Sequence, residues 1–125
     1  MKPRSIATAV LLFLFAGCQT WGPTWSEITG TRYNRTIADR WQAQIVSVGS
    51  NGVSQTPYMV APGTYSIGVE SPRHDGFAGT VQEMTLNVEP CKRYYINTQF
   101  SGPIGPNWSP VVDYVESIAG CKVGG

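Results

Sequence analysis

The stretch APGTYSIGVE, residues 61–70, decides the fold class because it joins a turn to an alternating strand. Its Pro-Gly pair has the residue types that occupy the two central positions of a type II turn. After that pair, Tyr65, Ile67 and Val69 alternate with polar or small residues, which is the pattern of a half-buried strand. We therefore expect a turn followed by a strand whose inner face carries these three side chains.

The same period of two extends along the chain in both directions, and no window keeps helical spacing over ten residues. In RWQAQIVSV, for example, Trp41, Ala43 and Ile45 are expected to point inward. The predicted strands are 27–34, 40–48, 53–60, 61–70, 81–88, 92–100 and 110–118. The sequence therefore predicts an all-β fold, a small antiparallel β-sandwich of about seven strands with immunoglobulin-like or transthyretin-like topology.

The composition fits one domain. The chain has 125 residues, of which 42% are hydrophobic and 14% charged, enough apolar content for a single core. Its 14 glycines and 9 prolines separate the short β-rich runs and form no repeat.

The N-terminus has the pattern of a targeting segment. Lys2 and Arg4 precede an almost unbroken apolar run at residues 6–16, which is shorter than the ~20 residues that a membrane-spanning helix needs. The run is followed by FAGC, residues 15–18, which resembles the lipobox of bacterial lipoproteins, with Phe15 where Leu is usual. The resemblance implies cleavage before Cys18 and lipidation of that cysteine; the alternative is a chance cysteine after an ordinary signal peptide.

The expected organisation is a signal peptide at 1–17, a lipidated tether at 18–25 and a β-sandwich domain at 26–125. Without the signal peptide the chain has seven basic and eight acidic residues, a balance that gives no electrostatic reason to expect a nucleic-acid partner. Gln19, rather than Asp, follows the cysteine, and the lipoprotein resemblance then implies the outer membrane with the domain in the periplasm.

The remaining two cysteines are expected to form a disulfide. If Cys18 carries lipid, Cys91 and Cys121 remain as a pair in an oxidising compartment. A hairpin of the last two strands that pairs Ser101 with Pro110 would place the two cysteines within one residue of directly opposite each other.

No catalytic or metal site is expected. The single histidine, His74, is followed by Asp75 in a loop, where a solvated side chain is favoured over a general base. Asp113 and Glu116 are three residues apart, which places them on opposite faces of a regular strand. No zinc or calcium pattern and no nucleophile or phosphate-loop motif is present, so we expect neither an enzyme nor a cofactor.

The candidate recognition loop is residues 101–109, which contains Asn107 and Trp108, and the stretch GPIGPNWSP at 102–110 has three prolines. A rigid aromatic residue in such a loop could recognise a partner. The alternative is that Trp108 folds back as a lid over the core.

Two further resemblances concern the domain. Residues 61–70 resemble the Pro-Gly-x-Tyr strand of PEGA-type modules, and PCKRYYINTQF with NWSPVVDYVESIAGC resembles the end of a group of short proteobacterial lipoproteins without an established activity. We therefore expect a non-catalytic binding or structural module of the cell envelope, attached to the membrane through its N-terminal lipid and with another envelope protein as its partner. The alternative is a small-ligand or glycan binder, with or without hydrolytic activity.

Overall fold

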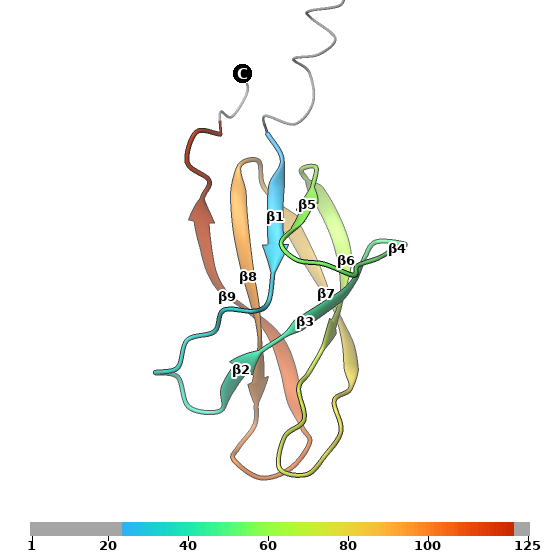
Figure 1. The fold of residues 1–125 in the computed structure, drawn as a ribbon, viewed down its shortest axis with the longest axis vertical. Helices are drawn as coiled ribbons and strands as arrows, with labels where there is room; N and C mark the ends of the chain where they lie inside the picture. The colour runs from blue at the N-terminus through green and yellow to red at the C-terminus, as the bar shows by residue number, and fades with distance from the viewer. Residues whose placement is uncertain (1–23, 122–125) are drawn as a thin grey trace, which may run out of the picture.

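The computed structural model describes residues 24–121, and in this range all regular elements are strands arranged as two facing sheets (Figure 1). The strands are β1 (Ser26–Thr29), β2 (Arg40–Gln42), β3 (Gln44–Val48), β4 (Asn51–Gly52), β5 (Tyr58–Val60), β6 (Gly63–Glu70), β7 (Val81–Val88), β8 (Lys92–Phe100) and β9 (Trp108–Ser117). The predicted all-β sandwich is confirmed, with nine strands instead of about seven. No helix within residues 24–121 is long and apolar enough to cross a bilayer.

Strand β8 lies at the centre of the first sheet. One edge of β8 pairs along its whole length with β9, in antiparallel orientation. Its other edge is divided: β1 pairs in parallel with residues 93–95, and β2 pairs antiparallel with residues 97–99. β5 extends this sheet beyond β1, and the second sheet has the order β4-β3-β6-β7 with antiparallel pairs only. The β1–β8 pair is therefore the exception to an otherwise antiparallel sandwich.

The predicted strand at 40–48 is divided between the two sheets. Its first part is β2 and its second part is β3, with Ala43 at the junction. The Ala43 N–H donates to the Gly30 carbonyl at 2.9 Å, and a Cβ at position 30 would lie 2.1 Å from the Ala43 oxygen. Only glycine allows this close approach. Ala43 and Ile45 are buried as expected. Trp41 points toward the inner face as expected, but it is 42% exposed beyond the edge of the second sheet.

The core lies between the sheets, and the alternation of β6 and β7 is confirmed there. Ile67 and Val69 are fully buried, and Leu86 and Val88 on the neighbouring strand β7 are buried on the same face of this sheet. The residues of the buried cluster are Ile28, Ala43, Ile45, Val48, Val60, Ile67, Val69, Leu86, Val88, Tyr94, Ile96, Phe100 and Trp108. The turn before β6 is not of type II: Gly63 has a φ of 154°, far from the value of about +80° that this turn requires.

Candidate functional site

Cys91 and Cys121 form a disulfide, with their Cα atoms 5.6 Å apart. The predicted register was wrong, because Pro110 pairs with Thr98 and not with Ser101. The cysteines meet because the chain turns back after β9: the Ile118 N–H donates to the Cys91 carbonyl at 3.0 Å. The disulfide therefore lies just beyond the strand pair and holds the end of β9 beside the start of β8.

Trp108 is not presented to a partner. It is the first residue of β9, only 6% of it is exposed, and it belongs to the core cluster. Its indole Nε1 donates to Thr80 Oγ1 at 2.8 Å, and its carbonyl accepts a hydrogen bond from Gln82 Nε2 at 2.7 Å. Asn107 is exposed, and its carbonyl accepts the Ser101 N–H and closes the loop. The structure thus contradicts recognition through Trp108 and agrees with the alternative, a lid over the core.

His74 is not a solvated loop residue. Its ring stacks on Phe100 with centroids 3.8 Å apart, and Trp41 contacts it edge-on at 6.3 Å. The His74 Nε2 lies 3.3 Å from the Gly102 carbonyl oxygen, which ties together the two loops at this end of the sandwich. The imidazole is therefore held by packing and by this contact.

Asp113 and Glu116 share one face of the sheet, contrary to the expectation from their spacing. Tyr95 pairs with Tyr114 but Ile96 pairs with Val112, so Asp113 is an extra residue in a β-bulge. The bulge shifts the alternation by one and brings both carboxylates to the outer face. They do not form a catalytic pair, because each is bound to a different arginine.

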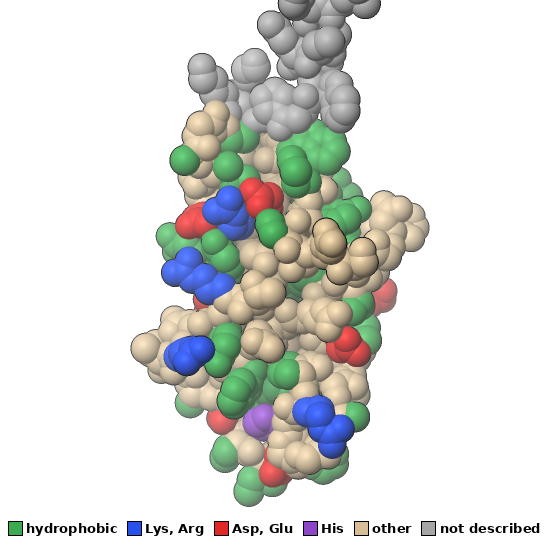
Figure 2. Space-filling view, viewed as in Figure 1, with side chains coloured by type: hydrophobic (Ala, Val, Ile, Leu, Met, Phe, Trp, Pro, Cys, Tyr) green, Lys and Arg blue, Asp and Glu red, His purple; other side chains and the backbone are tan. Residues whose placement is uncertain are grey.

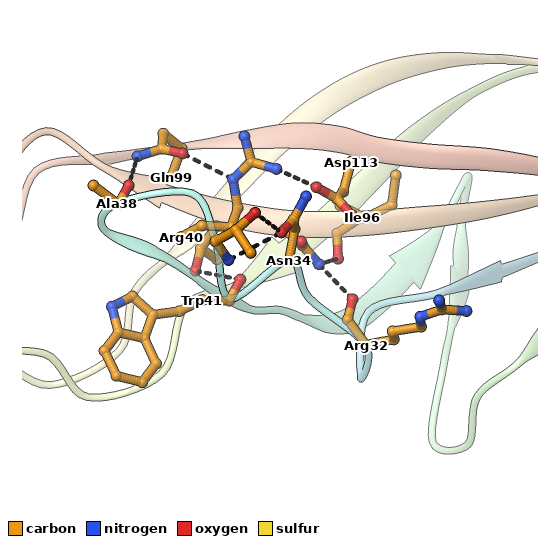
Figure 3. Close-up of polar contacts among 11 residues, drawn as sticks. Arg32, Asn34, Ala38, Arg40, Trp41, Ile96, Gln99 and Asp113 are labelled. Carbon is orange, nitrogen blue, oxygen red and sulfur yellow. Dashed lines mark hydrogen bonds and ion pairs between the residues drawn. The ribbon is translucent and has the colours of Figure 1, made fainter.

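The first of these ion pairs belongs to a network on the outer face of β8. Arg40 contacts Asp113 through its guanidinium and donates to Gln99 Oε1 at 2.8 Å, as Figure 3 shows. Beneath the neighbouring loop, Asn97 donates to the Arg32 carbonyl at 2.8 Å and is fully buried. These contacts fix the 31–39 segment against the sheet.

The second ion pair involves Glu116 and two neighbouring side chains. The Tyr95 hydroxyl and the Arg93 guanidinium both donate to Glu116 Oε1 at 2.6 Å, and together they hold the pKa of this carboxyl below its ordinary value, with the tyrosine contact the larger cause. Arg93 also binds Glu27 at 3.0 Å, and these two carboxylates raise the pKa of its guanidinium. Glu116 is therefore ionised in the folded protein at neutral pH, and β9 is joined through Arg93 to β1.

The free edge of β9 is the candidate interaction site, which we call the β9 edge (residues 109–117). Within the described part of the chain, β8 is the only strand that pairs with β9. The Trp108 carbonyl points away from β8, toward Gln82, and residue 110 faces the same way two positions later. A proline is tolerated at such a position because its missing N–H would point to solvent. In Figure 1 this edge forms the outer margin of the first sheet.

Inward-facing side chains remain exposed along this edge. Val112 and Val115 pair directly with Ile96 and Tyr94, two residues of the buried cluster, so they lie on the face toward the core. Nevertheless, Val112 is 39% exposed and Val115 is 40% exposed. On the outer face, Tyr114 is 53% exposed. The sandwich is thus uncovered where a further strand would lie.

These residues lie on the seventh predicted strand, and the sequence does not identify them as a site. The signal in PVVDYV was that apolar residues occur on both faces of the strand, which is unusual for a strand with one solvated face. Cys18, the expected lipidation site, lies outside the described residues, and residues 24–121 contain no group of three or more His, Cys, Asp or Glu that could hold a metal ion.

Comparisons of this chain with protein-family models, with curated proteins and with solved structures found no match.

Proposed function

We propose that this protein is a lipid-anchored envelope protein of the outer membrane that works, without catalysis, by binding an extended segment of another envelope protein along the β9 edge. Attachment through Cys18 rests on the FAGC motif, and the single observation that carries the binding proposal is the exposure of Val112 and Val115 on a face directed toward the core. An added strand would pair with the free backbone groups of β9 and cover both valines.

The other edges of the two sheets are less suited to strand addition. β4 and β5 are only two and three residues long, which is one way in which proteins protect sheet edges. β7 is a longer edge of eight residues, but its inward-facing Leu86 and Val88 are already buried. β9 has ten residues, with Pro110 and the bulge at Asp113 as its only interruptions. Beyond the bulge, residues 114–117 therefore offer the stretch that a partner strand would occupy first.

The anchor is tested by metabolic labelling with a fatty acid. Cys18→Ser should abolish the label and release the protein from the membrane fraction or leave it unprocessed, whereas Cys91→Ser should keep the label. Unchanged labelling of the Cys18 variant would contradict lipid attachment at this residue.

The binding proposal is tested by crosslinking in intact cells. Val115→Lys places a charge on the inner face of the edge, a substitution that blocks strand addition, and the half-exposed position lets the lysine reach solvent. The matched control is Val81→Lys at the start of β7, where the valine is 55% exposed. The crosslinked envelope protein should disappear in Val115→Lys and persist in Val81→Lys, with both melting temperatures near that of the wild type.

Three results would overturn the proposal. The first is capture that is equal in the two variants. The second is no capture of an envelope protein by the wild type. The third is capture of a second copy of this chain alone, which would assign the edge to self-association.

The alternative function is binding of a small ligand or glycan. It is favoured by a surface pocket of about 420 Å³ whose lining includes Tyr33, Trp41 and His74, described below.

A further inference from the structure

Trp41 is an inward-facing residue that the second sheet leaves uncovered. It pairs with Thr98, which is fully buried on the inner face of β8, while its neighbour Arg40 pairs with Gln99 on the outer face. Figure 3 shows the consequence: Arg40 points into the polar network, and the indole of Trp41 projects to the opposite side. Since the chain switches sheets at Ala43, no strand of the second sheet, among the residues that the structure describes, continues beneath this indole.

The exposed indole is held in a ladder of aromatic rings. Phe100 is in the core, His74 stacks on it, and Trp41 contacts His74 edge-on. Tyr33 then stacks against Trp41 with centroids 5.9 Å apart. Figure 2 shows hydrophobic side chains gathered around the purple imidazole of the single histidine. The ladder fixes the indole in one orientation, although 42% of the residue is exposed.

Three rings of the ladder line a surface pocket of about 420 Å³, which we call the Trp41 pocket; its lining includes Tyr33, Arg35, Asp39, Trp41, His74 and Pro103. The volume lies in the range of small-molecule sites, roughly 300–1,000 Å³.

Two side chains of the pocket are available to bind a ligand. Within residues 24–121, neither Arg35 nor Asp39 takes part in an ion pair. The Arg35 guanidinium lies 5.3 Å from the centre of the Tyr33 ring, and the Asp39 backbone is held by a hydrogen bond from the Phe100 N–H to its carbonyl at 2.9 Å. Both side chains can therefore form hydrogen bonds with a ligand.

The chemistry of these groups narrows the class of ligand. One guanidinium and one carboxylate balance in charge, and the third charged group of the lining, Arg40, is neutralised by Asp113. A strongly charged ligand gains nothing from such a set. A pyranose ring has an apolar C–H face that can pack on aromatic rings and hydroxyls that can donate to a carboxylate and accept from a guanidinium. We infer that the Trp41 pocket binds a neutral pyranose unit of an oligosaccharide, with Trp41 and Tyr33 as the apolar wall and Arg35 and Asp39 as hydroxyl partners.

The test is saturation-transfer difference NMR on the full-length protein in detergent, with cellotetraose, maltotetraose and fully N-acetylated chitotetraose as sugar probes and a proline-rich peptide as a fourth probe. At least one tetrasaccharide should receive saturation at the C–H protons of one ring face. Trp41→Ala should weaken its binding by about tenfold or more, Trp41→Phe should weaken it less because a ring remains, and Asp39→Asn should weaken it while keeping a residue type that tolerates the positive φ of 57°.

The matched control is Tyr114→Ala, which removes an aromatic side chain that is 53% exposed on the opposite edge of the same sheet and should leave sugar binding unchanged. Absence of saturation transfer from all three sugars at millimolar concentration, or equal binding by Trp41→Ala in a normally folded variant, would overturn the inference. Saturation of a proline-rich peptide instead of any sugar would reassign the pocket to peptide recognition. Tyr114 lies on the β9 edge and not in the Trp41 pocket. The sugar-binding proposal can therefore be contradicted while the partner-binding proposal stands, and the reverse also holds.

Discussion

Strands β7 and β9 end their sheets on the same side of the sandwich, yet only one of them has its inward-facing residues covered. On β7, Leu86 and Val88 are 6% and 2% exposed. On β9, Val112 and Val115 are 39% and 40% exposed. The two strands meet at Trp108, which bonds to β7 through the Gln82 side chain, and beyond this point Figure 1 shows β9 diverging from β7.

The difference shows that a strand can be fixed at both ends while one of its edges stays unpaired and its inward-facing side chains stay exposed. Trp108 secures the start of β9 in the core, and the Cys91–Cys121 disulfide secures the segment that follows its end. Between them the strand pairs with β8 alone, within the described residues.

The largest effect should come from Trp108→Ala. Removing a buried tryptophan typically costs about 3–5 kcal/mol of the free energy of unfolding. Here it also removes the hydrogen bond to Thr80 that joins β9 to the loop before β7. Denaturant titration measures the change. Ile104→Ala in the loop between β8 and β9 is the control, because Ile104 is 79% exposed and its removal should have little effect. Equal stability of the two variants would show that Trp108 does not secure β9.

The next effect should come from loss of the disulfide. Closing a loop with a sequence separation of 30 residues is expected to stabilise the fold by about 3–4 kcal/mol. The double variant Cys91→Ala/Cys121→Ala should therefore melt well below the wild type, and hydrogen exchange should increase first at the end of β9. A reductant should lower the wild-type melting temperature and leave the double variant unchanged. Two free thiols in protein taken from the envelope would contradict the bond.

A smaller, pH-dependent effect is expected at Glu116. The Tyr95 hydroxyl and Arg93 hold its pKa in the folded protein below the ordinary value of 4.5, so folding favours the ionised form. This stabilisation is present above pH 4.5 and is lost as the pH falls below that value through the folded pKa. Glu116→Gln should therefore lose less stability than the wild type on acidification, as measured by melting temperature. The exposed Glu83→Gln on β7 is the control, and a matching change there would contradict the assignment to Glu116.

The sequence predicted the fold class because alternation is a local property of each strand. Ile67, Val69, Leu86 and Val88 are buried as their period of two requires. It also predicted the Cys91–Cys121 bond, although through an incorrect register, because pairing followed from the compartment and the cysteine count more than from the strand geometry.

The candidate sites could not be predicted from the local alternation of apolar and polar residues. Alternation correctly directs Trp41, Val112 and Val115 inward, but it carries no information on whether a strand of the facing sheet lies beneath them. The bulge at Asp113 was equally hidden, since an extra residue is visible only against its partner strand. The recognition role considered for Trp108 was wrong for the opposite reason. A proline-rich loop suggested an exposed side chain, but the strand begins two residues earlier than predicted and places Trp108 in the core.

Site-specific photocrosslinking in intact cells tests the central claim most directly. A photoreactive phenylalanine analogue is placed singly at Val112, Tyr114 or Val115 on the β9 edge, and at Val81, Glu83 or Thr85 on β7, the other long edge. The account predicts that one envelope protein is captured from the β9 positions and not from the β7 positions. Capture of that protein from β7 alone, or equally from both strands, would contradict the β9 edge as the binding site.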